Sequence, residues 1–352
     1  MNIEFPQPPK AMAEMFNSQM TYEQQAFIKL LEKKALTHDE IISLNEANQF
    51  FKTTFNFLQS LKLTKLSATE LESLKQYIEE HINFLIVLEN KIQFNLLYRV
   101  TVVKDEFLEE GKVRNLLYLC CPPVELLKKL GLYNRASSPD ATVFYASFHK
   151  NVALHEIKPQ SGQRVIVTTW QNVTQKPFVS FPIANNEKVK DINLLKSNKA
   201  LKALKESIHP LLFDRIDSYL RFLSSEFVKS IEDRSPQRIE YFYSAFFGDR
   251  ILNKKREVSV KVKPENESGE DMGNYDCILY PSVAFNHREA NVAIAPKSLI
   301  ENLKPCQMEE FIVEETDYEI YDNIEKSPIK MKVLRNLTHI KNGRLLWDDD
   351  EV

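Results

Sequence analysis

Residues 93–103 read QFNLLYRVTVV, and this run marks a change in the periodicity of the sequence. It is rich in β-branched and aromatic residues, which favour β-strands. Over the preceding ninety residues the apolar positions instead recur at steps of three and four, as in amphipathic helices. The sequence therefore predicts an α-helical N-terminal extension over residues 1–92, followed by an α+β domain over residues 93–352 that ends in strands.

Three capping boxes predict where the helices of the extension begin. In this motif a Thr or Ser side chain caps the first turn, and a Glu or Gln three residues later bonds back to it. The pairs are Thr21 with Gln24, Thr37 with Glu40, and Thr69 with Glu72. The third helix carries an apolar stripe that must pack against another element.

Short strands and helices alternate irregularly after residue 103. Helical segments are predicted over residues 124–130, ending at Gly131, and over 151–156, 207–230 and 237–252. Strands are predicted over residues 142–145, 164–170, 275–280, 291–295, 310–313 and 331–334. The polar composition of residues 261–274 indicates an exposed loop. This mixture predicts one α+β domain, with no internal repeat.

The composition is that of a soluble globular protein. Of the 352 residues, 43% are apolar and 27% are charged, and the formal net charge of −3 creates no field that favours nucleic acid or an anionic membrane. The N-terminus lacks the basic and apolar regions of a signal peptide, and no apolar run approaches the roughly 20 residues needed to cross a bilayer. We therefore expect a cytoplasmic protein with no nucleic-acid or membrane partner.

The cysteines and glycines exclude several common sites. Cys120, Cys121, Cys277 and Cys306 form no C-x-x-C motif, so we expect reduced thiols and no metal. The seven glycines form neither G-x-G-x-x-G nor a P-loop, so side chains must hold any nucleotide. We expect the acidic residues 348–351 to be a solvated tail, and the lysines between positions 188 and 205 to form a solvated helix face.

Four pieces of sequence, taken in order, suggest a chemical site. The first is LYRV at residues 97–100, which places an arginine in an apolar strand. The second is YNRASSP at 133–139 followed by TVFYAS at 142–147, and the third is VALHE at 152–156. The fourth is YPSV at 280–283 followed by NVAI at 291–294. Packing or solvent exposure would account for each piece alone, so the information lies in their order and spacing.

In this order the pieces resemble the RES domain, a family named for an arginine, a glutamate and a serine. The resemblance spans about residues 93–296. It implies a fold similar to ADP-ribosyltransferases, with a mixed or antiparallel sheet and helical insertions. Several members are toxins that degrade NAD⁺ by hydrolysis or phosphorolysis, and some transfer ADP-ribose to protein. This chain departs from the family at residues 137–140, where SSPD replaces a segment with glycine, and in the long separation between Glu156 and Ser282.

Carried over by position, the resemblance implies a site made of Arg99, Arg135, Tyr145, Glu156 and Ser282, with NAD⁺ as substrate. The planar guanidinium groups of the two arginines suit the phosphates of NAD⁺. An ionised Glu156 would stabilise the positive charge that develops on the ribose. Tyr145 would contact the nicotinamide end. Ser282 would donate a hydrogen bond to substrate, because no Ser-His-Asp arrangement makes it a nucleophile.

Three functions remain open from the sequence. The first is an NAD⁺ glycohydrolase or phosphorylase that serves as a toxin or defence effector. The second is a mono-ADP-ribosyltransferase that modifies a protein, and the third is a scaffold that binds a nucleotide or a protein without turnover. In the RES family a toxin is neutralised by a small helix-turn-helix antitoxin, so an antitoxin or immunity protein is an expected partner. Inhibition in cis by residues 1–92 is the alternative. We expect His149 and His155 to lie beside the site or at the surface.

Overall fold

The computed structural model describes residues 3–7, 26, 29–30, 34–82, 89–183, 188–231, 235–253, 274–319 and 323–350. Its main helices are α3 (His38–Ser60), α4 (Ala68–His81), α5 (Val124–Leu130), α6 (Lys150–Ile157), α7 (Ile192–Ser207), α8 (Pro210–Phe227), α9 (Phe242–Asn253) and α10 (Pro296–Asn302). Its strands are β1 (Asn90–Ile92), β2 (Leu96–Val102), β3 (Leu108–Glu109), β4 (Lys112–Val113), β5 (Phe144–Ser147), β6 (Arg164–Asn172), β7 (Phe178–Pro182), β8 (Cys277–Pro281), β9 (Ala290–Ile294), β10 (Leu303–Thr316), β11 (Ile329–Lys341) and β12 (Arg344–Trp347). The predicted α+β class is confirmed.

One ten-stranded sheet organises the chain, in the order β1-β7-β8-β9-β5-β2-β6-β10-β11-β12. Neighbouring strands run antiparallel except β7 and β8, which are parallel, so the sheet is mixed as predicted. β1 pairs with β7, so the sheet already begins at Asn90. β2, which contains most of the run from residue 93 to 103, pairs with β6 over seven positions, from Leu96 opposite Gln171 to Val102 opposite Val165.

Capping boxes begin both described N-terminal helices. The predicted box of Thr37 and Glu40 at the start of α3 is confirmed. The predicted box of Thr69 and Glu72 is wrong, because Ser67 and Glu70 form the box of α4 two residues earlier. Both pairs fit the same sequence pattern. Because Ser67 is the N-cap residue of α4, Thr69 lies inside the first turn of the helix and cannot cap it. The remaining predicted box, Thr21 with Gln24, lies outside the described residues.

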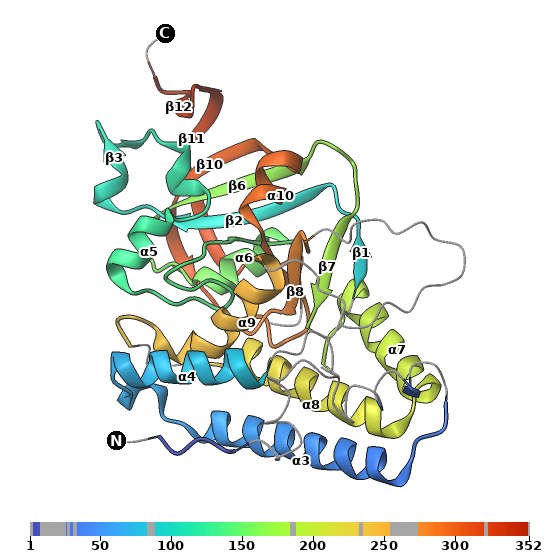
Figure 1. The fold of residues 1–352 in the computed structure, drawn as a ribbon. Coiled ribbons are helices and arrows are strands. Elements are labelled where there is room, and N and C mark those ends of the chain that lie inside the picture. Colours follow the sequence, from blue (N-terminus) through green and yellow to red (C-terminus); the bar gives the residue numbers. More distant parts are fainter. Residues whose placement is uncertain are drawn as a thin grey trace.

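The helices α3, α4 and α8 form a layer against one face of the sheet, with α9 between this layer and the strands (Figure 1). Aromatic rings connect the layers. Phe55 of α3 stacks on Phe222 of α8 at 4.7 Å between ring centroids, and Phe222 contacts Phe247 of α9 at 5.8 Å. Phe227 at the end of α8 contacts Tyr280 of β8 at 5.9 Å. The N-terminal helices therefore share one hydrophobic core with the sheet.

Gly248 of α9 allows this helix to approach the loop before β5. A Cβ atom at position 248 would lie 2.9 Å from the Cα atom of Ala136 and 3.0 Å from its carbonyl oxygen. Both contacts involve backbone, which cannot move aside as a flexible side chain can. Glycine at this position is therefore required by close packing, not by backbone conformation.

We predict that Gly248→Ala destabilises the protein. Alanine inside a helix would by itself stabilise by about 1 kcal/mol, but overpacking against the Ala136 backbone costs about 2 kcal/mol or more, so the net effect is a loss. Urea unfolding monitored by circular dichroism measures the change in the free energy of unfolding. Asp249→Ala, which removes only an exposed hydrogen bond to Asn253, is the control. A Gly248→Ala protein as stable as the wild type would contradict the close approach.

The acidic C-terminal run is part of the fold, so the prediction of a solvated tail is wrong for residues 348–350. Asp350 accepts hydrogen bonds from Arg114, from Lys112 Nζ at 2.6 Å and from the backbone N–H of Trp347 at 2.8 Å. Asp349 lies 2.9 Å from Lys112 Nζ. Arg114 and Lys112 are more than 230 residues away in sequence, so charge composition alone could not reveal these pairs.

We predict that Asp350→Asn lowers the melting temperature at pH 7. Hydrogen bonds from Arg114 and Lys112 hold the pKa of Asp350 well below its usual value of 3.8. A carboxyl group whose pKa is lower in the folded state than in the unfolded state stabilises the protein at pH values above its unfolded-state pKa. This contribution is lost as the pH falls below that pKa. The difference in melting temperature between wild type and variant should therefore shrink below pH 3.8. Asp317→Asn, at an exposed position, is the control, and a pH-independent difference would contradict the pairing.

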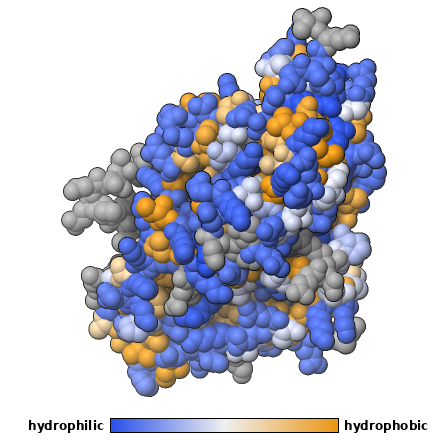
Figure 2. All heavy atoms as spheres, turned by 180° about the vertical axis from the view of Figure 1, so that it is seen from behind, coloured by the Kyte–Doolittle hydropathy of each residue, from blue (hydrophilic) through white to orange (hydrophobic). Residues whose placement is uncertain are grey.

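The surface is mainly hydrophilic. Figure 2 shows the face opposite to that of Figure 1, where apolar side chains gather near the C-terminal end of the chain. Strand β11 carries two exposed apolar residues, Val333 and Leu334. The predicted lysine face is confirmed on α7, where Lys196, Lys199 and Lys202 are exposed. Within the described ranges, no helix has the length and apolar character needed to span a membrane. The predicted loop at residues 261–274 lies outside the described residues except at its last position.

Candidate active site

The register of three neighbouring strands brings polar side chains together on the helix-covered face of the sheet. Ser147 of β5 lies opposite Asn291 of β9, and Asn291 lies opposite Tyr280 of β8. Tyr145 stands two residues before Ser147 and therefore shares its face. The alternate residues, such as Phe144, belong to a hydrophobic cluster on the other face. The alternation of residues along these strands thus places a row of polar side chains on the face of the sheet against which α6 packs.

Glu156, in the last turn of α6, is bound to this row. Its Oε1 atom accepts a hydrogen bond from Ser282 Oγ at 2.5 Å and another from Asn291 Nδ2 at 2.6 Å. Ser147 Oγ donates to Asn291 Oδ1, which orients the amide so that its NH₂ group faces the carboxylate. Glu156 is half-buried, and its Oε2 atom makes no hydrogen bond within the described part of the chain. These two bonds fix the position of Oε1.

Ser282 is fully buried and holds the loop between β8 and β9 together. Its backbone N–H donates to Glu289 O at 2.7 Å, and its Oγ accepts from the N–H of Phe285 at 3.1 Å. The hydroxyl proton is donated to Glu156, so Ser282 acts as a hydrogen-bond donor to the carboxylate. The ring of Phe285 packs against His155 of α6 at 5.1 Å, so His155 is buried beside the site.

Tyr145 supports the loop that contains the SSPD segment at residues 137–140. Its hydroxyl accepts a hydrogen bond from Ala136 N at 2.8 Å and lies 3.3 Å from Ser137 Oγ. Burial raises the pKa of Tyr145 to about 12, so the hydroxyl keeps its proton at neutral pH. Tyr145 therefore fixes the SSPD turn from the adjacent strand. Its expected contact with nicotinamide stays a prediction.

Arg135 is bound to the C-terminal end of α8. Its guanidinium donates to the carbonyl oxygens of Phe227 and Lys229, and it stacks over the ring of Tyr241 at 5.0 Å. Carbonyls at a helix C-terminus carry partial negative charge and attract a cation. Burial raises the pKa of Tyr280 strongly, and the positive charge of Arg135 acts in the opposite direction.

Arg99 lies apart from the other four predicted site residues. It shares a face of β2 with Leu97, its guanidinium is over the ring of Phe144 at 5.3 Å, and Nη1 donates to the backbone carbonyl of Tyr145 at 2.9 Å. Burial lowers the pKa of Arg99, and the nearby thiols of Cys121 and Cys120 act in the opposite direction. The structure thus joins Glu156 to Ser282 by a hydrogen bond and places Tyr145 on the same face of the sheet, with Arg135 in the loop that Tyr145 supports, but it places the Arg99 side chain on the opposite face.

Sequence reasoning missed Ser147 and Asn291 as site residues. Asn291 belongs to the NVAI segment, and it is the one polar residue of β9, whose other residues are apolar. A buried amide in such a strand needs hydrogen-bond partners, and that was the available signal. Ser147 carried no comparable signal, because its role depends on lying opposite Asn291 in the sheet.

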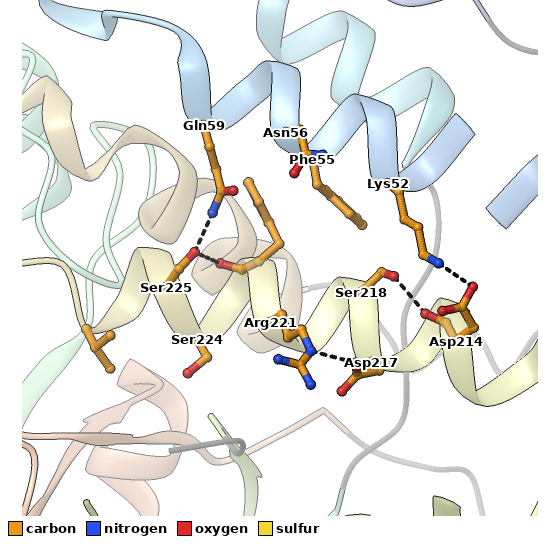
Figure 3. A pocket seen from close by; sticks show the side chains of 12 residues that line it. Lys52, Phe55, Asn56, Gln59, Asp214, Asp217, Ser218, Arg221, Ser224 and Ser225 are labelled. Carbon is orange, nitrogen blue, oxygen red and sulfur yellow. Dashed lines mark hydrogen bonds and ion pairs between the residues drawn. The ribbon is translucent and has the colours of Figure 1, made fainter. Parts of the chain in front are cut away.

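A groove of about 780 Å³ lies between α3 and α8 in the helical layer (Figure 3). Its charged side chains are already paired with one another: Lys52 Nζ lies 2.8 Å from Asp214, and Arg221 Nε donates to Asp217 at 2.5 Å. Among the residues that line the groove, no carboxylate accepts hydrogen bonds from buried donors in the way that Glu156 does. The groove therefore offers a polar surface but no arrangement suited to bond cleavage.

Comparison with known proteins identifies no relative: no family model, no curated protein and no solved structure matches the chain. The RES-domain resemblance consequently depends on the ordered sequence pieces alone.

We predict that Tyr145→Phe destabilises the protein by about 2 kcal/mol, because a buried backbone N–H at Ala136 loses its acceptor. Tyr98→Phe is the matched control on the adjacent strand β2, since the Tyr98 hydroxyl makes no hydrogen bond to a described residue. Chemical denaturation of both variants gives the two changes in the free energy of unfolding. Equal effects in the two variants would show that the Ala136–Tyr145 bond does not stabilise the turn.

Proposed function

We propose that this protein cleaves the nicotinamide–ribose bond of NAD⁺, as a glycohydrolase or a phosphorylase. The observation that carries the proposal is the Glu156 carboxylate, whose Oε1 atom is held by Ser282 and Asn291 while Oε2 is left for a ligand. Departure of nicotinamide leaves an oxocarbenium-like ribose, and an oriented carboxylate stabilises that positive charge without reorganising.

The hydrogen bonds to Oε1 suit this role. Donors from a serine and an asparagine fix the orientation of the carboxylate, and an oriented carboxylate stabilises a cation. One donor comes from the loop after β8 and the other from β9, so the carboxylate cannot rotate without breaking both bonds. Such preorganisation is the main source of electrostatic catalysis, because no rearrangement is needed as charge develops.

The positive charge that NAD⁺ phosphates require would come from Arg135. Its guanidinium is bound to the carbonyls of Phe227 and Lys229, and a phosphate that reached it would replace those neutral acceptors with a charged one. Arg99 would act from beneath the site by holding the Tyr145 carbonyl. In this proposal Ser282 and Asn291 position Glu156, and Tyr145 positions the loop that carries Arg135.

A biological role follows from the proposed chemistry. An enzyme that consumes NAD⁺ without regulation depletes a cofactor on which the whole metabolism of a cell depends. We therefore propose growth arrest or defence as the role, with a neutralising protein as the partner that keeps the enzyme silent in its host. Co-expression with a neighbouring gene product that restores growth would support this part of the proposal.

We predict that Glu156→Gln reduces the rate of NAD⁺ cleavage by about 10²-fold or more, because a neutral amide cannot stabilise the ribosyl cation. The full chain is incubated with NAD⁺, with and without phosphate, and released nicotinamide is measured by chromatography. Glu301→Gln on α10, an exposed glutamate, is the control and should keep wild-type activity.

The products separate the alternatives. Free ADP-ribose indicates hydrolysis, a phosphate-dependent ADP-ribose 1″-phosphate indicates phosphorolysis, and labelled protein indicates ADP-ribosyl transfer. Absence of nicotinamide release by the wild-type chain, or equal rates for wild type and Glu156→Gln, would contradict the proposed function.

A further inference from the structure

Three side-chain hydrogen bonds join the segment that contains β5 and α6 to the segment that contains β8 and β9. From the second segment, Ser282 and Asn291 donate to Glu156 Oε1 at 2.5 and 2.6 Å. From the first, Ser147 Oγ donates to Asn291 Oδ1. Ser147 is the last residue of β5, and α6, which carries Glu156, begins soon after it at Lys150. The amide of Asn291 therefore bridges two side chains of one continuous segment.

The orientation of the Asn291 amide depends on Ser147. The terminal torsion of an asparagine side chain has broad preferences, so the rotamer alone does not fix the plane of the amide. A carboxylate accepts hydrogen bonds and cannot donate them, so the NH₂ group must face Glu156 and Oδ1 must face the other way. Asn291 is buried, and within the described ranges only Ser147 donates a hydrogen bond to its Oδ1 atom. Ser147 is therefore the group that holds Oδ1 in place.

Loss of the Ser147 hydroxyl would weaken the support of the carboxylate. It would leave Asn291 Oδ1 buried without a donor, and an unsatisfied buried acceptor is costly. The amide reduces that cost when it turns its oxygen away from the empty position, and this turn takes Nδ2 away from Glu156. The carboxylate would then be held by Ser282 alone, and one hydrogen bond restrains its orientation less than two.

We propose that Ser147 is a positioning residue for NAD⁺ cleavage, which acts on Glu156 through the amide of Asn291. This inference depends on the proposed function and extends it to a residue that makes no hydrogen bond to the carboxylate itself. Ser147 is buried, so it acts without contact with substrate. A charge stabilises a developing cation best when it is held in place before the reaction begins. Ser147 therefore affects the bond-breaking step and leaves the binding of NAD⁺ unchanged.

A double-mutant cycle separates a positioning role from a purely structural one. Nicotinamide release from NAD⁺ by the full chain is measured for the wild type, Ser147→Ala, Asn291→Ala and the variant that carries both changes. Because Ser147 acts only through Asn291, its removal should have no further effect once the amide is gone. Ser180→Ala is the matched control. Ser180 is also a buried serine of the sheet, and its Oγ donates to Asn90 O at 2.7 Å, between β7 and β1.

We expect Ser147→Ala to lower kcat about tenfold with KM little changed, because the carboxylate is misplaced while the contacts that bind NAD⁺ remain. Asn291→Ala should lower kcat at least as much, and the double variant should match it within about twofold. Ser180→Ala should keep the wild-type kcat, although it too loses a buried hydrogen bond. Ser147→Cys fills nearly the same space with a weak donor. It should also lower kcat, and it replaces Ser147→Ala in the cycle if the alanine variant does not fold.

Failure of the proposed function and failure of the positioning role give different results. A wild-type chain that releases no nicotinamide overturns both. An active wild type with a folded Ser147→Ala variant that keeps the wild-type kcat overturns the positioning role alone. A double variant in which the two single losses multiply would also overturn it, and so would a change in KM without a change in kcat. An equal loss of kcat in Ser180→Ala would do the same, because any buried hydrogen bond would then set the rate.

Discussion

The candidate site depends on the register of four adjacent strands. Tyr98 of β2, Ser147 of β5, Asn291 of β9 and Tyr280 of β8 lie opposite one another in a row across the sheet. A shift of one residue in any of these strands would turn its members of the row to the other face. The apolar alternate residues specify the register, because they fill a core on that other face. Hydrophobic packing on one side of the sheet thus positions the polar chemistry on the other.

The helical layer positions the end of α8 that binds Arg135. The aromatic contacts that run from α3 through α8 to Tyr280 hold the end of α8 against the strands, and that end binds Arg135. Gly248 lets α9 reach the backbone of the same loop. Since α3 packs on α8, a shift of α3 would move the α8 C-terminus that binds Arg135. Inhibition in cis by residues 1–92, if it occurs, would act through this contact.

Local patterns predicted local structure well. Alternation and β-branched residues located β2, β6 and β9, and the capping box of Thr37 located the start of α3. Contacts distant in the sequence were beyond such patterns. The acidic C-terminus meets its basic partners more than 230 residues away, and the face that Arg99 occupies depends on the pairing of β2 with its neighbours. Glu156 and Ser282 were proposed as site residues through a family resemblance, whereas their hydrogen bond emerges only when α6 packs on the sheet.

In the proposed function, the carboxylate held by Ser282 and Asn291 faces the ribose from which nicotinamide departs. A crystal structure of the Glu156→Gln variant grown with NAD⁺ tests it most directly, since the variant should bind substrate without cleaving it. The account predicts the nicotinamide ribose within about 4 Å of the side chain at position 156, with its diphosphate near Arg135. A nucleotide bound elsewhere, for instance in the groove between α3 and α8 (Figure 3), would contradict the claim.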